Sequence, residues 1–454
     1  MFQDSLLPLS PPASGAPAVC ALRVGLMGTG VVGSGTCQVL ARNAELIAQR
    51  AGRPIKVVMA AARNVAKAMP VVGPDVALVS DPFAVVRHPD IDVVVEVMGG
   101  VTLAKELVLE AIAQGKHVVT ANKALLAEHG SEIFTAADAQ GVIVAYEGAV
   151  AVSIPIIKAL REGLAANRIH EVVGIVNGTT NFILSKMHQE GLSFESALCA
   201  ATALGYAEAN PSLDVEGIDA AHKIALLAAN AFGADVPFAQ VHAQGITTLD
   251  PWDMVCAQAL GYRIKLLGIA RQQQDSIDVR VHPALVPQGH LLAQVPDAMN
   301  GIWVNADAAG PTFHYGAGAG SQTTASAVVA DLIDVARLGS AGVGAHVPHR
   351  SVSPEAIRHW PVQPIGHVVS RFYLRFTLGP QSLLLNRLRL DLLSVGIELQ
   401  QEAHVRHPED SRCDSWVVLT QSLSGEALAV ALEAFAQISG GTAPAAVWRV
   451  EDLV

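Results

Sequence analysis

A glycine-rich turn between an apolar run and an amphipathic run constrains this fold most strongly. The run ALRVGLMG is apolar enough for a buried strand, and VVGSGTCQVLARNAELIAQR repeats apolar residues at helical spacing. Between them, the pattern G-x-G-x-x-G is matched by Gly28, Thr29, Gly30, Val31, Val32 and Gly33. Such glycines allow the turn, the approach of a pyrophosphate and close helix–strand packing. The motif therefore predicts a dinucleotide-binding turn, and a tight turn without a ligand is the alternative.

Short β-rich runs alternate with helical segments through the first third of the chain. PIKVVMAAARN, IDVVVEVMGG, KHVVTAN and GVIVAYEG have the character of strands, and AKELVLEAIAQG that of a helix. This alternation predicts a Rossmann-type α/β fold with a doubly wound parallel sheet and a ligand at the carboxyl ends of its strands. Lys123 follows one of these strands, where a cation can meet both cofactor and substrate. By itself it also fits a surface lysine at a helix start.

The end of the second predicted strand bears on the choice of dinucleotide. An acidic side chain at this point would bind the ribose 2′-hydroxyl of NAD(H). This chain has Arg63 instead, and Lys67 follows one turn later. Because cations suit a 2′-phosphate, the sequence predicts that NADP(H) is preferred and that NAD(H) is possible. A pair of solvated surface charges is the alternative.

Composition and charge exclude several classes of protein. The chain has 454 residues, of which 51% are hydrophobic and 16% charged, which suits two or three domains with sizeable cores. A net charge of −11 argues against bulk binding to nucleic acid or an anionic membrane. No apolar run is long enough to span a bilayer, and the start of the chain lacks a signal-peptide pattern. The five scattered cysteines suit a reduced, cytoplasmic protein.

Two segments in the middle of the chain carry most of the charged candidate residues. In LGYAEANPSLDVEGIDAAHKIALLA, Asp219 and Lys223 are four residues apart in a helical pattern and share one helix face. A lysine beside a carboxylate, near a nicotinamide, can donate a proton to a carbonyl oxygen. Glu208 and Asp214 precede that helix and can bind the ammonium group of an amino-acid substrate. On spacing alone, an ordinary surface ion pair is the alternative.

Seven segments together resemble homoserine dehydrogenase. In the order of that family, from about residue 23 to residue 337, they are GTGVVGSG, EVMGG, GKHVVTANKALLAEHG, YEGAVAVSIPIIKALREGL, GIVNGTTNFILSKM, LGYAEANPSLDVEGIDAAHK and GAGAGSQTTASAVVADLIDVAR. The resemblance implies that the chain reduces L-aspartate 4-semialdehyde to L-homoserine with NAD(P)H, on the route to threonine and methionine. It also implies that Lys223 donates the proton beside Asp219, and that Lys123 contacts both nicotinamide and substrate.

The resemblance implies further binding residues. The substrate-binding set is Glu208, Asp214, Asp219, Tyr206 and Lys123. The cofactor-binding set consists of the glycine turn together with Arg63, Lys67, Lys123, Gly205, Gly318 and Gly320. A turn with Glu147, Val150, Val152 and Ile154 resembles the family's site for a monovalent cation, usually sodium, held largely by backbone carbonyls. Here Val152 and Ser153 stand where the family often has two glycines.

The last part of the chain has a different character. From residue 367 it has the pattern strand, helix, strand, strand, helix, strand, and it resembles the ACT domain through which many family members bind an amino-acid effector, often threonine. LGPQS, residues 378–382, replaces the usual Asp-x-Pro-Gly turn, so a role in oligomer packing stays equally open. The family implies a homodimer or a homotetramer.

These observations predict the domain organisation. Residues 1–20 are expected to form a flexible tail, and residues 21–150 a cofactor domain completed by about 312–340. Residues 151–311 are expected to form an α+β substrate and dimerisation domain, 341–366 a linker and 367–454 a βαββαβ ACT-like domain. Two other functions stay open at this point: another NADP-linked reductase on the same fold, and a non-catalytic amino-acid sensor.

Overall fold

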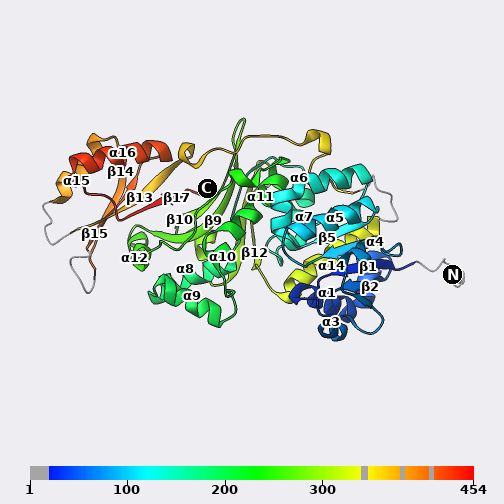
Figure 1. The fold of residues 1–454 in the computed structure, drawn as a ribbon. Helices are drawn as coiled ribbons and strands as arrows, with labels where there is room; N and C mark the ends of the chain where they lie inside the picture. Colours follow the sequence, from blue (N-terminus) through cyan, green and yellow to red (C-terminus); the bar gives the residue numbers. More distant parts are fainter. Residues whose placement is uncertain (1–19, 339–345, 379–383, 408–413, 454) are drawn as a thin grey trace, which may run out of the picture.

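The structure is a computed structural model that describes residues 20–338, 346–378, 384–407 and 414–453. Figure 1 shows an elongated molecule with a parallel sheet at one end, a mixed sheet in the middle and the last strands at the other end. Residues 1–19 of the tail predicted for 1–20 and most of the LGPQS turn lie outside the described residues. Among the described helices, none combines the length and the apolar character needed to cross a membrane.

The first sheet is parallel, six-stranded and ordered β3-β2-β1-β4-β5-β6. Its strands are β1 (Leu22–Met27), β2 (Ile55–Ala61), β3 (Ala77–Val79), β4 (Val93–Glu96), β5 (His117–Thr120) and β6 (Val144–Ala145). The connecting helices are α1 (Val31–Arg42), α2 (Ala44–Ala51), α3 (Val65–Val72), α4 (Pro82–Arg87), α5 (Thr102–Ala113) and α6 (Lys123–Gln140). The predicted Rossmann-type sheet is confirmed, and its order reverses between β1 and β4, which opens a crevice at the carboxyl edge.

A late helix completes the packing of this region. After β6 the chain forms a short turn at Glu147–Ala149, and then α7 (Ile156–Lys158), which continues as the helical turn Ala159–Gly163. Much later it returns to this region as α14 (Ser321–Leu338), which packs along α1 (Figure 1). Gly35 permits this approach, because a Cβ there would lie 2.6 Å from the carbonyl oxygen of Ser321. The Ser321 hydroxyl donates to the carbonyl of Val31 at 2.7 Å.

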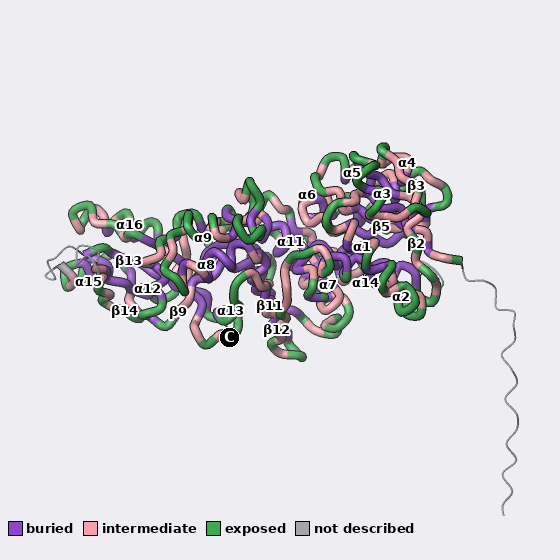
Figure 2. The backbone as a smooth tube through the Cα atoms, turned by 90° about the horizontal axis from the view of Figure 1, so that it is seen from below, coloured by how far each residue is buried: buried purple, intermediate pink, exposed green. Residues whose placement is uncertain are grey.

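The middle region is built mainly on antiparallel strands, with β8 paired in parallel to β10, and on one central helix. Its strands are β7 (Ile169–Ile175), β8 (His242–Ala243), β9 (Tyr262–Gln272), β10 (Ile277–Pro287), β11 (Met299–Ala306) and β12 (Gly310–Ala317). Its helices are α8 (Gly178–Glu190), α9 (Phe194–Ala203), α10 (Ser212–Val215), α11 (Ile218–Phe232), α12 (Pro251–Ala259) and α13 (Leu291–Gln294). Figure 2 shows that α11 is buried along most of its length. It lies between this sheet and α6, and so it joins the two halves of the molecule.

The C-terminal strands extend the sheet of the middle region. The elements are β13 (Val369–Thr377), α15 (Leu384–Ser394), β14 (Leu399–Val405), β15 (Ser415–Thr420), β16 (Leu423–Ser424), α16 (Gly425–Ile438) and β17 (Ala446–Val450). Apart from the two-residue β16, this is the predicted pattern. The pairing of β17 with β10, through Ala284–Arg449 and Leu285–Val450, makes one eleven-stranded sheet. The sequence did not predict this continuity, because β10 and β17 are far apart in the chain.

A buried charge cluster holds the junction between β10 and the last residues. Arg280 donates to Glu451 at 2.8 Å, and Arg271 pairs with the other oxygen of Glu451 at 2.9 Å and with Glu171 at 2.8 Å. Arg280 and Glu451 are each only 1% exposed. Burial alone would raise the pKa of Glu451, but the two guanidinium groups outweigh burial and lower that pKa to about 2. The C-terminal region is therefore bound to the middle sheet by both backbone pairing and ion pairs.

We expect Glu451→Gln to lower the free energy of unfolding by about 1.5–3 kcal/mol, because Arg280 and Arg271 lose the carboxylate that they share and keep only Asp278 and Glu171 as counter-charges. In the unmodified chain this contribution is complete above the ordinary glutamate pKa of 4.5 and is lost as the pH falls towards about 2. Denaturant unfolding at neutral and acidic pH measures both effects. The control is Glu426→Gln, at an exposed glutamate in α16. Equal unfolding midpoints for the two variants would contradict the prediction.

Candidate active site

The predicted dinucleotide turn lies between β1 and α1, at the carboxyl edge of the parallel sheet. Gly28 has φ of +103°, a conformation that favours glycine. A Cβ on Gly33 would lie 2.0 Å from the carbonyl oxygen of Gly28, so helix and turn can approach only with glycine there. A Cβ on Gly30 would meet no atom within 4 Å, and no side chain caps α1. The open turn and the uncapped helix N-terminus fit a pyrophosphate.

Two alanine substitutions separate the structural from the binding role of this turn. We expect Gly33→Ala to lower the melting temperature, because its Cβ collides with the backbone of Gly28. We expect Gly30→Ala to leave the melting temperature unchanged and to weaken dinucleotide binding by about tenfold or more, because its Cβ occupies the open side of the turn. Thermal unfolding and calorimetric titration with NADPH measure the two effects. Unchanged NADPH affinity in Gly30→Ala would contradict a ligand at this turn.

The two predicted phosphate-binding cations follow the neighbouring strand. The N–H of Gly28 donates to the carbonyl of Ala61 at 3.2 Å, and Arg63 follows two residues after this carbonyl. Arg63 is exposed, and so is Lys67 in the first turn of α3. Asn64 caps α3 by accepting from the N–H of Lys67 at 3.1 Å. Both cations therefore stand beside the dinucleotide turn with their charges open to solvent.

The predicted catalytic residues meet at one carboxylate. Asp219, in the first turn of α11, lies between Lys223 Nζ at 2.7 Å and Lys123 Nζ at 2.9 Å. Lys223 Nζ also donates to the carbonyl of Val176 at 2.8 Å. Lys123 begins α6 directly beyond β5, at the same sheet edge as the glycine turn. The helical spacing predicted the contact between Asp219 and Lys223, and only the packing of α6 on α11 brings Lys123 to the same carboxylate.

The pKa values of the two lysines that share this carboxylate shift in opposite directions. Burial alone would raise the pKa of Asp219, but the ammonium groups of Lys223 and Lys123 outweigh burial and hold it well below its ordinary value. Burial lowers the pKa of Lys223, although Asp219 opposes the shift. Burial also acts on Lys123, but Asp219 outweighs it and raises that pKa. Lys223 is therefore the more readily deprotonated of the two.

Asn177 is a site residue that the sequence analysis did not single out. Its amide nitrogen donates to Asp214 Oδ1 at 2.7 Å and to Asp219 Oδ2 at 2.8 Å. Its amide oxygen accepts from the N–H of Thr180 at 2.8 Å and caps α8. The pattern Asn-Gly-Thr-Thr after a strand is a helix-start signal and could have predicted the cap. The bridge between the two carboxylates depends on tertiary contacts and has no local signal.

The remaining predicted substrate residues line the approach to this cluster. Burial raises the pKa of Asp214, which lies in α10. Glu208 is exposed in the preceding loop, and its charge helps to raise the pKa of Lys123. The Tyr206 ring lies 5.0 Å from that of Phe182, and the Tyr206 carbonyl accepts from the Thr179 hydroxyl at 2.8 Å. Gly205 has φ of +76° and starts this loop.

The predicted cation turn is compact and buried. Val150 and Ile154 are buried and Val152 is half-buried. The turn closes through the N–H of Ile154, which donates to the carbonyl of Ala151 at 2.7 Å. The Glu147 carboxylate accepts from the N–H groups of residues 157 and 158 at 2.9 Å each, so its side chain caps the next helix. Among the described residues, no three His, Cys, Asp or Glu side chains are grouped to hold a metal.

The two connections between the cofactor and catalytic regions touch each other. The first connection contains Ser153 and the second contains Ala317. The Ser153 hydroxyl donates to the carbonyl of Ala317 at 2.7 Å. Gly318 follows, and a Cβ there would lie 2.3 Å from the Asn300 amide. Gly320 has φ of +131° and lies just before α14. These two predicted cofactor residues thus stand where the chain returns to the dinucleotide domain.

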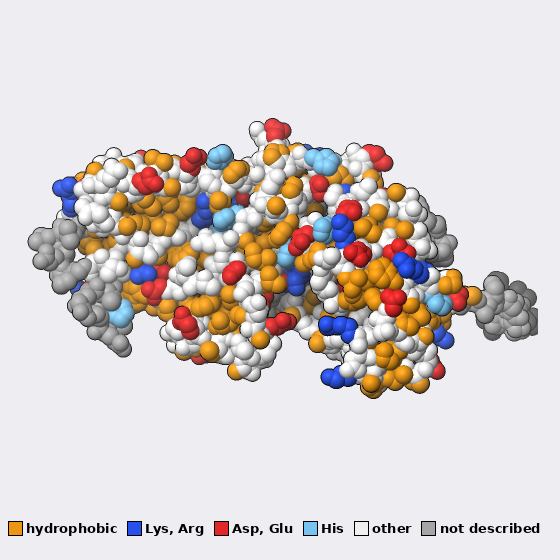
Figure 3. Space-filling model, viewed as in Figure 1, with side chains coloured by type: hydrophobic (Ala, Val, Ile, Leu, Met, Phe, Trp, Pro, Cys, Tyr) orange, Lys and Arg blue, Asp and Glu red, His pale blue; other side chains and the backbone are white. Residues whose placement is uncertain are grey.

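The surface between the two regions is hollowed in Figure 3, with basic and acidic side chains at its rim. The glycine turn, Lys123 and the first turn of α11 all lie at this junction, where an open parallel sheet binds its ligand. A nicotinamide held there would face an ammonium–carboxylate cluster that can transfer a proton. The fold and the site define an NAD(P)-dependent oxidoreductase.

Comparison with known proteins identifies the family. A family model described as "Homoserine dehydrogenase" matches residues 155–333, and one described as "Homoserine dehydrogenase, NAD binding domain" matches residues 28–147. The homoserine dehydrogenase of Pseudomonas aeruginosa is 46% identical over 95% of this chain and 99% of its own length. That of Neisseria gonorrhoeae is 51% identical over 78% of this chain and 81% of its own. A crystal structure of a homoserine dehydrogenase from Thiobacillus denitrificans has 47% identity, a TM-score of 0.89, and covers 96% of this chain and 99% of its own. The chain belongs to the homoserine dehydrogenase family.

Proposed function

We propose that the chain reduces L-aspartate 4-semialdehyde to L-homoserine with Lys223 as the proton donor, and with Asp219 and Lys123 as its partners. The observation that carries this proposal is the Asp219 carboxylate, held at 2.7 Å and 2.9 Å between two lysine ammonium groups. The cluster lies at the same sheet edge as the dinucleotide turn. When bound, the reduced nicotinamide supplies the hydride.

The residues of the cluster provide charge stabilisation and a proton. Negative charge develops on the aldehyde oxygen, and the Lys223 ammonium group stabilises that charge and donates the proton. Burial lowers the pKa of Lys223, which makes this ammonium a better acid than an exposed lysine. Asp219 keeps both lysines oriented, and Asn177 holds Asp219 and Asp214 in place.

The neighbouring carboxylates support recognition of an amino-acid substrate. Glu208 and Asp214 are acidic, and we propose that they and Tyr206 bind the substrate, with the carboxylates receiving its ammonium group. Gly205 begins the same loop and belongs to the proposed cofactor contacts. An aldehyde without an ammonium group would leave these carboxylates unpaired, so this site favours an amino-acid aldehyde over a simple one.

Oxidation of NADPH in the presence of L-aspartate 4-semialdehyde tests this function. The expected result is saturable oxidation that needs the semialdehyde and is at least tenfold slower with 4-oxobutanoate, which differs from it only in lacking the ammonium group, on the scale of a lost charged hydrogen bond. A folded chain that binds NADPH but oxidises it with neither aldehyde would favour a sensor. Oxidation with other aldehydes alone would favour a different reductase.

We propose NADP(H) as the preferred cofactor, supported by the exposed Arg63 and Lys67 beside the dinucleotide turn. We expect Arg63→Ala to raise KM for NADPH by about tenfold and to leave KM for NADH unchanged, because only NADPH has the 2′-phosphate. Steady-state kinetics with both cofactors measure the split. Lys56→Ala, at an exposed lysine in β2, is the control. A parallel rise in KM for both cofactors would contradict a phosphate-binding role.

Further properties belong to the same proposal. We propose that the turn at Glu147, Val150, Val152 and Ile154 binds sodium through its carbonyls, and that the C-terminal βαββαβ region is an ACT-like domain that takes threonine as an effector. We also propose that the chain acts in the cytoplasm in threonine and methionine biosynthesis, as a homodimer or homotetramer, without a nucleic-acid or membrane partner. The family resemblance supports these statements.

A further inference from the structure

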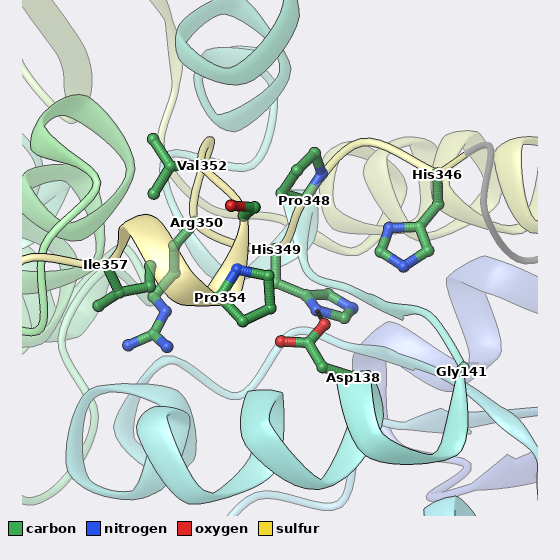
Figure 4. Close-up of a pocket in the computed structure, with 10 residues that line it drawn as sticks. Asp138, Gly141, His346, Pro348, His349, Arg350, Val352, Pro354 and Ile357 are labelled. Atoms are coloured by element: carbon green, nitrogen blue, oxygen red, sulfur yellow. Dashed lines mark hydrogen bonds and ion pairs between the residues drawn. The ribbon is translucent and has the colours of Figure 1, made fainter.

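A cavity far from the proposed active site lies under the segment that leads from α14 to the C-terminal strands. It measures about 280 Å³, at the small end of the range for ligand pockets. Figure 4 shows residues of this segment on one side and the end of α6 on the other. The cavity is lined by Asp138, Gly141, His346, Pro348, His349, Arg350, Val352, Ser353, Pro354 and Ile357. None of these residues takes part in the proposed reaction.

Arg350 is a nearly buried cation with unused hydrogen-bonding capacity. Its side chain is only 9% exposed, and within the described residues its guanidinium makes one long hydrogen bond, to Asp235 at 3.4 Å. The group also lies 5.7 Å from the Phe134 ring centroid. A guanidinium has five N–H donors, and this one bond uses a single donor. The other donors can bind a ligand in the cavity, and a carboxylate matches their geometry.

Asp138, near the end of α6, offers the opposite charge in the same cavity. One of its oxygens accepts from His349 Nδ1 at 2.9 Å, while the N–H of Val144 donates to Nε2 of the same ring at 3.0 Å. These two bonds describe a neutral imidazole with its proton on Nδ1. The second oxygen of Asp138 has no hydrogen-bond partner among the described residues. It is available to an ammonium group.

The charge balance of the cavity selects the class of ligand. The cavity is lined by both a cation, Arg350, and a carboxylate, Asp138. A zwitterion can place its carboxylate on Arg350 and its ammonium group on Asp138, and the apolar walls from Val352, Pro354 and Ile357 suit a small aliphatic side chain.

We propose that this cavity binds a free aliphatic α-amino acid and acts as an effector site. Asp138 lies at the end of α6, the helix that begins with Lys123, and Asp235 follows α11, which carries Asp219 and Lys223. At 1.5 Å per residue, the site is about 22 Å along α6 from Lys123. A ligand here joins the far ends of the two helices that meet at the active site. The effector role rests on the proposed function, but the binding site does not.

Calorimetric titration of the full chain with L-valine tests the site. Two matched compounds, 3-methylbutanoate and isobutylamine, each lack one of the charged groups of valine. We expect valine to bind with a Kd on the order of 0.1 mM, and both single-charge compounds to bind at least tenfold more weakly. The absence of saturable binding of valine would overturn the proposed site. If either single-charge compound bound as tightly as valine, the claim that the site requires a zwitterion would be overturned.

Variants locate the binding and separate it from a second amino-acid site in the C-terminal region. We expect Arg350→Met and Asp138→Asn to raise the Kd for valine at least tenfold, and Arg358→Met, at an exposed arginine of the same segment, to leave it unchanged. Asp138→Asn keeps an acceptor for His349, so it preserves the fold if Arg350→Met does not. Unchanged affinity in folded Arg350→Met and Asp138→Asn would overturn this location.

Kinetics test the effector role separately. Saturating valine is expected to change KM for the semialdehyde at least twofold in the unmodified chain and to leave it unchanged in Arg350→Met. Binding without any change in KM or kcat would overturn the effector role while the binding site stands. An inactive chain that still binds valine would instead count against the proposed function alone.

Discussion

Replacing Lys223 with methionine is expected to lower kcat for aldehyde reduction by about 10²–10⁴-fold, the usual contribution of a positioned proton donor. Methionine keeps most of the length of the side chain and removes the ammonium group that Asp219 and the Val176 carbonyl hold at 2.7 Å and 2.8 Å. Asp219 keeps its second partner, Lys123, at 2.9 Å, so the variant does not leave a buried carboxylate without a counter-charge. We therefore expect the chain to fold and to bind NADPH normally.

Steady-state kinetics and NADPH titration measure the two halves of this prediction. Lys186→Met is the matched control, because Lys186 lies on α8 and pairs with Glu190 one turn later. It is expected to keep the activity of the unmodified chain. Full activity in Lys223→Met would show that Lys223 takes no part in the reaction. If the variant lost both its fold and NADPH binding, Lys223 would have a structural role instead.

Replacing Asp219 with asparagine is expected to lower kcat/KM on the order of 10²-fold and to shift its pH dependence. Reduction requires Lys223 in its protonated form, so activity falls as the pH rises through the pKa of Lys223. Burial already lowers that pKa, and the Asp219 carboxylate opposes the shift. Without the carboxylate the pKa falls further, and the alkaline limb of the profile moves to lower pH.

The profile of kcat/KM against pH distinguishes this effect from a loss of stability. Asp307→Asn, at an exposed aspartate in the turn between β11 and β12, is expected to keep both the rate and the profile. A reduced rate with an unshifted alkaline limb in Asp219→Asn would show that Asp219 does not set the pKa of the proton donor. The shift in pH is a readout that misfolding of part of the population does not produce.

Local sequence patterns predicted the fold class and part of the candidate site. The order of strands and helices in the parallel sheet follows from alternating apolar runs, and the turn from Gly28 to Gly33 follows from glycines placed between a strand and a helix. The contact between Asp219 and Lys223 follows from their spacing on one helix. Each of these features involves residues close together in the chain, where backbone geometry relates spacing to position.

Other features could not be predicted because they join distant segments. Lys123 and Asp219 belong to different helices, and Asn177 bridges two carboxylates from two further elements. The roles of the cation turn, the phosphate-binding arginine and the loop around Tyr206 stay predictions. Neither periodicity nor composition predicts the distance between α6 and α11 or the strand with which β17 pairs.

The sequence by itself determined the dinucleotide turn, the parallel sheet and the lysine–aspartate pair, since hydrophobic periodicity and glycine chemistry act over a few residues. Only the tertiary structure decided that Lys123 and Lys223 share one carboxylate, that β17 extends the catalytic sheet through β10, and that Arg350 and Asp138 line the same cavity. The physical reason is that these contacts depend on the packing of whole elements, in which the burial of apolar surface selects which distant polar groups meet.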